Sequence, residues 1–201
     1  TLLLSAHFYE EINRGAMIKS PVEFIMGTFR SFRVKFPSGI TLREKYETNL
    51  GVIWLTSDQG MNIGDPPSVS GWPAYYQAPS FDRSWISTNT IALRALRTDS
   101  LVYWGFWTPA YLLNFDLVDF VDHLNDPEDP NAVVQESAIL LLGMDIAQER
   151  KDNLKTVLLS GQATDAYWTV AWIDYKNDPE NEMKKSLVNT RLQTFYRLFL
   201  Q

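Results

Sequence analysis

The 201-residue sequence contains no cysteine, only two histidines and no long apolar run. Without cysteine there can be no disulfide bond, no thiolate nucleophile and no cysteine-ligated metal centre, and both reducing and oxidising compartments suit the chain. A membrane-spanning helix needs ~18 consecutive apolar residues, and no segment approaches that length. We therefore expect no membrane span in these residues.

Basic side chains are also scarce: 18 Lys and Arg stand against 24 Asp and Glu, the net charge is -6, and there is no basic run. This balance argues against nucleic acids and anionic membranes as partners. A hydrophobic content of 45% fits a single globular domain, which we predict over residues 1–201. Because the sequence starts at Thr1 with an apolar stretch and no methionine, we expect a C-terminal fragment of a longer protein.

Helix-start signals recur along the chain. Ser20, Pro21 and Glu23 combine a cap hydroxyl, a proline in the first turn and a glutamate that can reach back to the cap, which predicts a helix to about residue 33. The same box recurs at Thr41 and Glu44, with apolar residues following on one side of a second helix that ends near residue 58: Leu42, Tyr46, Leu50, Ile53 and Trp54.

Further segments have helical spacing. Four aspartates share one side of residues 116–126, which predicts an amphipathic helix. Asp145 is expected to cap a helix that stops at Gly161. Trp168 and Trp172 lie on an aromatic stripe, and residues 180–200 are expected to form a last helix. Asp126-Pro127 and Asp178-Pro179 are interpreted as helix starts. No segment alternates apolar and polar residues long enough to predict a sheet. The sequence therefore predicts an all-α, multi-helix array.

A long loop interrupts the helices at about residues 64–87. Four prolines and two glycines exclude a continuous helix there, and five aromatic rings favour an ordered loop over a disordered one. Residues 72–111 hold ten of the 27 aromatic side chains, so the richest aromatic surface is expected in this part of the chain. A helix should resume near Thr88.

Two sequence blocks resemble a known family. Residues 66–73 (Pro-Pro-Ser-Val-Ser-Gly-Trp-Pro), followed by Trp85 and Arg94, and the upstream residues 14–23 resemble the signature of the bacterial family catalogued as domain of unknown function 1800. The resemblance covers the C-terminal portion of that family. It implies a mostly helical, exported protein that is periplasmic, on the cell surface or secreted, and it supplies no catalytic residue.

The sequence departs from the family pattern at several positions. Ser68 and Ser87 stand where asparagine is usual, Met61 replaces glutamine, and residues 74–84 are longer than the usual turn. If the family amides bind a ligand, that role is in doubt here; if they cap turns, serine can replace them at small cost.

Catalytic and metal motifs are absent from the sequence. His7 and His123 lie in different segments, and there is no HExxH motif, nucleophile elbow, Walker loop or dinucleotide fingerprint. Residues 110–136 carry seven acids and no Lys or Arg, but the spacing around residues 126–131 lacks a calcium-loop pattern, so a solvated acidic face is favoured. We expect no metal and no cofactor.

The aromatic loop is the predicted interaction surface for a carbohydrate or another exported protein. Tryptophan and tyrosine rings stack on sugar rings, and nearby polar groups can fix hydroxyls. Trp72 and Trp85 are expected to anchor the loop more than to touch a ligand, whereas the rings between them suit either role. The candidate ligand-binding residues are Trp72, Tyr75, Tyr76, Gln77, Phe81, Trp85, Asn89 and Arg94.

Two other functions remain open. A polysaccharide hydrolase would use two carboxylates on either side of the scissile bond, drawn from acids such as Glu23, Asp65 or Asp82, although no spacing selects a pair. Alternatively, these residues stabilise an active N-terminal half of the protein.

Overall fold

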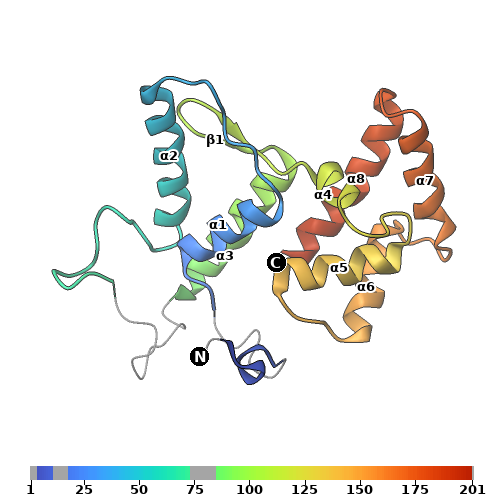
Figure 1. Ribbon diagram of the computed structural model, residues 1–201, viewed down its shortest axis with the longest axis horizontal. Coiled ribbons are helices and arrows are strands. Elements are labelled where there is room, and N and C mark those ends of the chain that lie inside the picture. Colours follow the sequence, from blue (N-terminus) through green and yellow to red (C-terminus); the bar gives the residue numbers. More distant parts are fainter. Residues whose placement is uncertain (1–3, 11–17, 73–84, 201) are drawn as a thin grey trace. The chain divides into compact units, whose positions relative to one another are not determined.

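The computed structural model describes residues 4–10, 18–72 and 85–200. These residues form an all-α array with one small hairpin, as the helical spacing predicted (Figure 1). The elements are η2 (Ala6–Tyr9), α1 (Pro21–Ser31), α2 (Leu42–Ser57), α3 (Thr88–Tyr103), β1 (Phe106–Trp107), β2 (Leu112–Leu113), α4 (Leu117–Asp122), α5 (Pro130–Leu142), α6 (Gln148–Leu158), α7 (Ala166–Asn177) and α8 (Glu182–Phe199).

The chain divides into two compact units. One comprises residues 17–115, with α1 to α3 and the hairpin, and the other comprises residues 1–16 and 116–201, with α4 to α8. We call them the loop unit and the C-terminal unit. The expected single domain over residues 1–201 stays a prediction.

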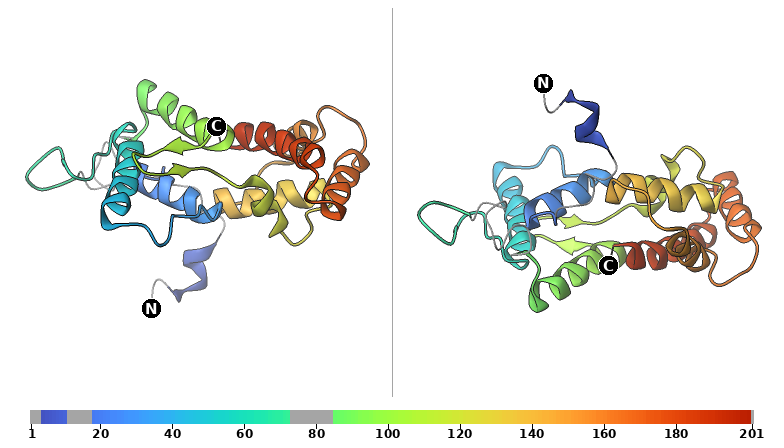
Figure 2. Two further views of the ribbon diagram at one scale, coloured as in Figure 1. Left: turned by 90° about the horizontal axis from the view of Figure 1, so that it is seen from above. Right: turned by 90° about the horizontal axis from the view of Figure 1, so that it is seen from below.

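In the loop unit the antiparallel hairpin lies between α1 and α3 (Figure 2). Phe106 pairs with Leu113 in the hairpin register, and Leu113 is completely buried. Phe32 at the end of α1 stacks on Phe115 just after β2, with ring centroids 4.4 Å apart and planes 11° from parallel, and Phe29 meets the same ring edge-on at 6.3 Å. Aromatic packing therefore fixes α1 against the hairpin.

The helix starts expected at Ser20 and Thr41 are confirmed as complete capping boxes. The Ser20 hydroxyl accepts from the Glu23 N–H, and the Glu23 carboxylate accepts from the Ser20 N–H at 3.0 Å. Thr41 and Glu44 make the same reciprocal pair, which holds the pKa of Glu44 below its usual value. These contacts span three residues, so the local sequence suffices to predict them.

The apolar side of α2 is not the side that packs. Leu42, Tyr46 and Trp54 are 84%, 65% and 45% exposed, whereas the buried positions are Thr48, Gly51, Leu55 and Thr56. The physical reason is a close approach of the hairpin tip: a Cβ atom on Gly51 would lie 2.4 Å from Cγ2 of Thr108. The small residue Gly51 therefore makes the contact with the hairpin, and the large rings of α2 face outward.

The C-terminal unit is built around α8, which contacts α4, α6 and α7. Val188, Leu192 and Phe195 of α8 are completely buried. The aromatic stripe predicted on residues 168–175 is confirmed: Trp168 stacks on Trp172 at 5.5 Å, and both are buried.

Three helix starts in this unit differ from the sequence-based expectation. Asp129 caps α5 and Asn181 caps α8, so the helices start after the Asp126-Pro127 and Asp178-Pro179 steps. Asp145 does not cap α6, whose first flanking residue is Ala147. The Asp145 carboxylate instead accepts from Gln135 and pairs with Lys151, contacts that the sequence does not reveal.

No helix in the described part of the chain combines the length and apolar character that a membrane crossing needs.

Candidate functional site

The candidate site is the base of the aromatic loop, where the C-terminal end of α2 meets α3. In the turn that follows α2, Gly60 has a φ of +94°, and the Met61 N–H donates to the carbonyl of Thr56 at 2.9 Å. A second turn follows, in which the Gly71 N–H donates to the carbonyl of Ser68 and Gly71 has a φ of +93°. Both turns use the left-handed conformation that glycine tolerates best.

Ser68 and Ser87 make local turn and cap contacts. The Ser68 hydroxyl donates to the carbonyl of Gly71 at 3.0 Å, and the Ser87 hydroxyl accepts from the Thr90 N–H at the start of α3. The Thr90 hydroxyl in turn donates to the carbonyl of Trp85 at 3.0 Å. The two serine hydroxyls therefore make a turn contact and a helix-cap contact, as serine commonly does.

The two loop tryptophans pack against each other. Their ring centroids are 6.1 Å apart with planes tilted by 50°; Trp85 is 6% exposed and Trp72 is half-buried. The burial of Trp85 fits the anchoring role expected for this pair, and leaves Trp72 as the ring with an accessible surface. Asn89 is exposed on the first turn of α3. Tyr75, Tyr76, Gln77 and Phe81 lie outside the described residues.

Arg94 ties α3 to the segment before α1. Its Nη2 atom donates to the carbonyl of Lys19 at 2.8 Å, and its guanidinium lies over the ring of Phe24 at 5.0 Å. Burial lowers the pKa of this guanidinium, although arginine remains charged. The Nε atom is buried and has no hydrogen-bond partner among the described residues.

Arg97, one turn further along α3, has the same arrangement. It pairs with the carboxylate of Asp58 at the end of α2 and lies over the ring of Phe106 at 5.6 Å. The ion pair joins two positions 39 residues apart in the chain, so the local sequence does not reveal it. The Nε atom of Arg97 is also buried without a described hydrogen-bond partner.

Gln59 contributes a third unpaired polar atom at the loop base. The residue is completely buried; its Nε2 donates to the carbonyl of Leu55 at 2.9 Å, and its Oε1 has no partner within the described part of the chain. Sequence reasoning missed Gln59, because a glutamine at the end of a helix is usually solvated. Nothing in its local sequence marks it as buried.

Among the described residues, one acceptor on Gln59 and two guanidinium N–H donors at the loop base therefore have no hydrogen-bond partner. Stacking on Phe24 and Phe106 covers the faces of the guanidinium groups but leaves their Nε–H edges unpaired. An unpaired buried polar atom costs about 1–3 kcal/mol, which is a large amount for a domain stable by about 5–15 kcal/mol. Such groups are uncommon in native proteins, and a ligand that pairs with them would recover this energy.

Of the acids named for a hydrolase, Glu23 and Asp65 lie in the described residues. The carboxylate of Glu23 accepts from the Ser20 N–H and hydroxyl in the capping box, and Asp65 is exposed on the loop. Asp82 lies outside the described residues. No pair with a catalytic separation is described at the loop base.

The acidic segment of residues 110–136 uses several of its carboxylates structurally. Asp116 and Asp129 cap α4 and α5, and Glu136 accepts from Asn125. Asp122 pairs with Lys176 at 2.6 Å, which raises the pKa of the lysine. Within the described ranges, no group of three or more potential metal ligands occurs.

The comparison with protein families identifies the chain. The family model described as a protein of unknown function, DUF1800, matches residues 1–190 of the 201. The chain belongs to the DUF1800 family. The match extends well beyond the two blocks at residues 14–23 and 66–94. No curated protein and no solved structure matches the chain.

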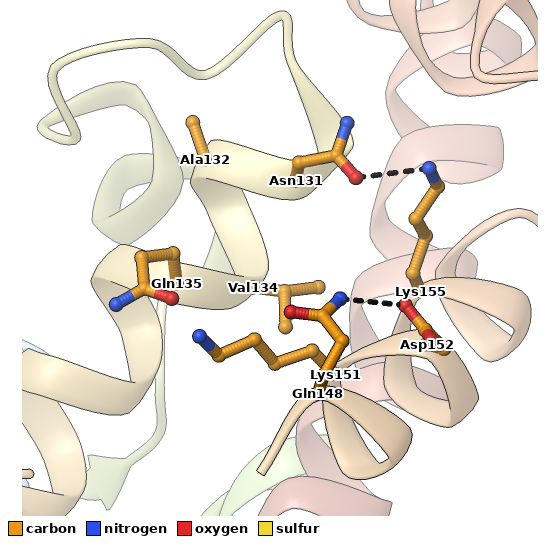
Figure 3. Close-up of a pocket in the computed structure, with 8 residues that line it drawn as sticks. All are labelled: Asn131, Ala132, Val134, Gln135, Gln148, Lys151, Asp152 and Lys155. Atoms are coloured by element: carbon orange, nitrogen blue, oxygen red, sulfur yellow. Dashed lines mark hydrogen bonds between the residues drawn. The ribbon is translucent and has the colours of Figure 1, made fainter. Parts of the chain in front are cut away.

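This DUF1800 chain also has a polar pocket in its C-terminal unit. It lies between α5 and α6 and has a volume of about 340 Å³ (Figure 3). Its lining consists of Asn131, Ala132, Val134, Gln135, Gln148, Lys151, Asp152 and Lys155. No sequence pattern marks this pocket, because its lining residues are ordinary surface types that helix packing brings together.

Proposed function

We propose that this DUF1800 chain is a binding module of an exported protein and that the loop base, together with the aromatic loop, recognises a carbohydrate. The observation that carries the proposal is the set of buried polar atoms on Gln59, Arg94 and Arg97 that have no hydrogen-bond partner among the described residues. A hydroxyl group donates and accepts at once, so it can bridge an amide oxygen and a guanidinium N–H.

Aromatic side chains support a carbohydrate over an anion as the ligand. Trp72 presents a partly exposed ring backed by Trp85, and rings of this kind stack on the apolar faces of sugars. Asn89 is exposed nearby in sequence, at the start of the helix that carries Arg94. Arg97 is already neutralised by Asp58, which weakens any attraction for a free anion.

The test is a glycan array probed with the native chain and with Gln59→Met. This substitution keeps side-chain volume but removes the unpaired Oε1 and also the Nε2 that donates to the carbonyl of Leu55. The two effects on stability oppose each other, so we expect loss of glycan binding and a free energy of unfolding within about 1 kcal/mol of the native value. The matched control is Thr48→Val in α2, the helix that precedes Gln59. Thr48 is also buried, but its hydroxyl already donates to the carbonyl of Glu44 at 2.8 Å.

A second arm replaces Tyr75, Tyr76 and Phe81 together by alanine, and we expect this variant to lose binding too. An array on which the native chain binds no glycan overturns the carbohydrate ligand. Equal binding by native chain and Gln59→Met overturns the loop base as the site.

The exported location follows from the family resemblance and is tested separately. Fractionation of cells that express the tagged full-length protein should place it in the periplasm, on the surface or in the medium. Recovery in the cytoplasm alone would contradict export.

A further inference from the structure

The pocket between α5 and α6 is organised by two ion pairs at its edges. Lys151 pairs with Asp145 at 2.8 Å, and the same carboxylate accepts from Gln135 at 3.0 Å. The hydrogen bond from Lys151 holds the pKa of Asp145 below its usual value. These contacts fix the Lys151 ammonium and the Gln135 amide together at one end of the pocket, as Figure 3 shows.

Lys155 holds the other edge and has little capacity for a ligand. Its Nζ donates to the Asn131 side-chain oxygen at 2.9 Å and contacts both oxygens of Asp165 at 2.8 and 2.9 Å. An ammonium group has three N–H donors, and these contacts occupy them. Lys155 and Asn131 therefore shape the pocket rather than bind within it.

Four side chains retain hydrogen-bonding capacity toward the pocket. Lys151 and Gln135 each have unused N–H donors, and the Gln135 carbonyl oxygen can still accept. Gln148 donates to Asp152 at 2.8 Å, which leaves one amide N–H and one amide oxygen on Gln148 and a second carboxylate oxygen on Asp152. Donors and acceptors thus alternate along the lining.

This alternation selects the chemical class of the ligand. An anion would face the Asp152 carboxylate, and a cation would face the Lys151 ammonium. A hydroxyl group can donate to an acceptor and accept from a donor at one place, so a polyhydroxylated neutral molecule matches the lining. Ala132, which is half-buried at the pocket, supplies apolar surface for the C–H face of such a molecule.

We propose that this pocket binds a single sugar ring, with Lys151, Gln135, Gln148 and Asp152 as its hydrogen-bonding residues. A volume of about 340 Å³ is at the small end of ligand pockets, which suits one ring and not a long chain. No lining residue belongs to the loop base, so this proposal is independent of the function proposed there.

The experiment titrates the ¹⁵N-labelled chain with individual neutral monosaccharides and follows backbone amide shifts. We expect saturable shifts for amides of α5 and α6. Because each neutral hydrogen bond contributes about 0.5–1.5 kcal/mol, Gln148→Ala should weaken binding about two- to tenfold, and Asp152→Ala, which removes a charged acceptor, at least about tenfold. Asn153→Ala, on an exposed position of the same helix, is the matched control and should bind like the native chain.

Two further arms make the outcome decisive. The affinity for the sugar should not change with salt, because no net charge is neutralised; a steep loss of affinity with salt would indicate an anionic ligand and overturn the class. Gln59→Met should leave these shifts unchanged, which separates this pocket from the loop base. Absence of saturable shifts with every monosaccharide, or equal binding by Gln148→Ala, Asp152→Ala and the native chain, overturns the proposal.

Discussion

Replacing Gly51 by alanine should destabilise the loop unit, although alanine is the better helix former. Gly51 lies inside α2, where glycine costs about 1 kcal/mol relative to alanine. The added Cβ would lie 2.4 Å from Cγ2, 2.6 Å from Cβ and 3.1 Å from Cα of Thr108. Two of these distances are shorter than real Cβ contacts allow, so α2 or the hairpin must move.

Thr108 cannot move freely to relieve this contact. It is 4% exposed, its hydroxyl donates to the carbonyl of Tyr111 at 2.7 Å, and the same oxygen accepts from the Tyr111 N–H at 2.8 Å. Overpacking in a fixed environment costs about 1–3 kcal/mol or more. Because two of the contacts are shorter than real Cβ contacts, we take the upper part of this range, about 2–3 kcal/mol; after the helix-propensity gain of about 1 kcal/mol is subtracted, we expect a net loss of about 1–2 kcal/mol in the free energy of unfolding.

Gly27→Ala is the matched control for this prediction. Gly27 lies inside α1, and an added Cβ there meets nothing within 4 Å, so the substitution should stabilise the chain by about 0.4–1 kcal/mol. Thermal unfolding followed by circular dichroism should therefore give Gly51→Ala a lower Tm than the native chain and Gly27→Ala a higher one, with a gap of about 4–12 °C between them. A Gly51→Ala variant as stable as Gly27→Ala would refute the close approach of α2 and the hairpin.

Two further predictions concern the C-terminal unit. The Tyr196 hydroxyl lies 2.9 Å from the Ser137 hydroxyl, and both residues are completely buried. In urea unfolding, Tyr196→Phe should lower the free energy of unfolding by about 1–3 kcal/mol, because it leaves the serine hydroxyl without this partner. The double variant Tyr196→Phe with Ser137→Ala should recover much of that loss. Hydrogen bonds from Lys155 and Lys151 hold the pKa values of Asp165 and Asp145 below the ordinary aspartate value. These pairs therefore contribute their full stabilisation above the ordinary pKa of aspartate, and the contribution is lost as the pH falls through the lowered pKa values. Replacing both aspartates by asparagine should reduce the drop in Tm between neutral and acidic pH; an unchanged drop would contradict this linkage.

Local chemistry determined the helix starts of the loop unit. Each capping box, at Ser20 and at Thr41, is formed by residues only three apart, so it depends on the local sequence alone. Both helix starts were therefore predictable from the sequence. The proline and glycine content of residues 64–72 likewise excluded a helix without any tertiary information. The helical class of the chain follows from such short-range patterns.

Only tertiary packing decided which faces and which side chains the protein uses. The periodicity of α2 marked Leu42 and Tyr46, but the hairpin approaches on the side of Gly51, because a missing Cβ permits a closer contact than any large side chain does. Gln59, just after α2, and Arg97 on α3 are 38 residues apart in the chain, and each has a buried polar atom without a partner among the described residues. Hydrophobic spacing reports what a helix can bury, whereas shape complementarity between distant segments determines what it does bury.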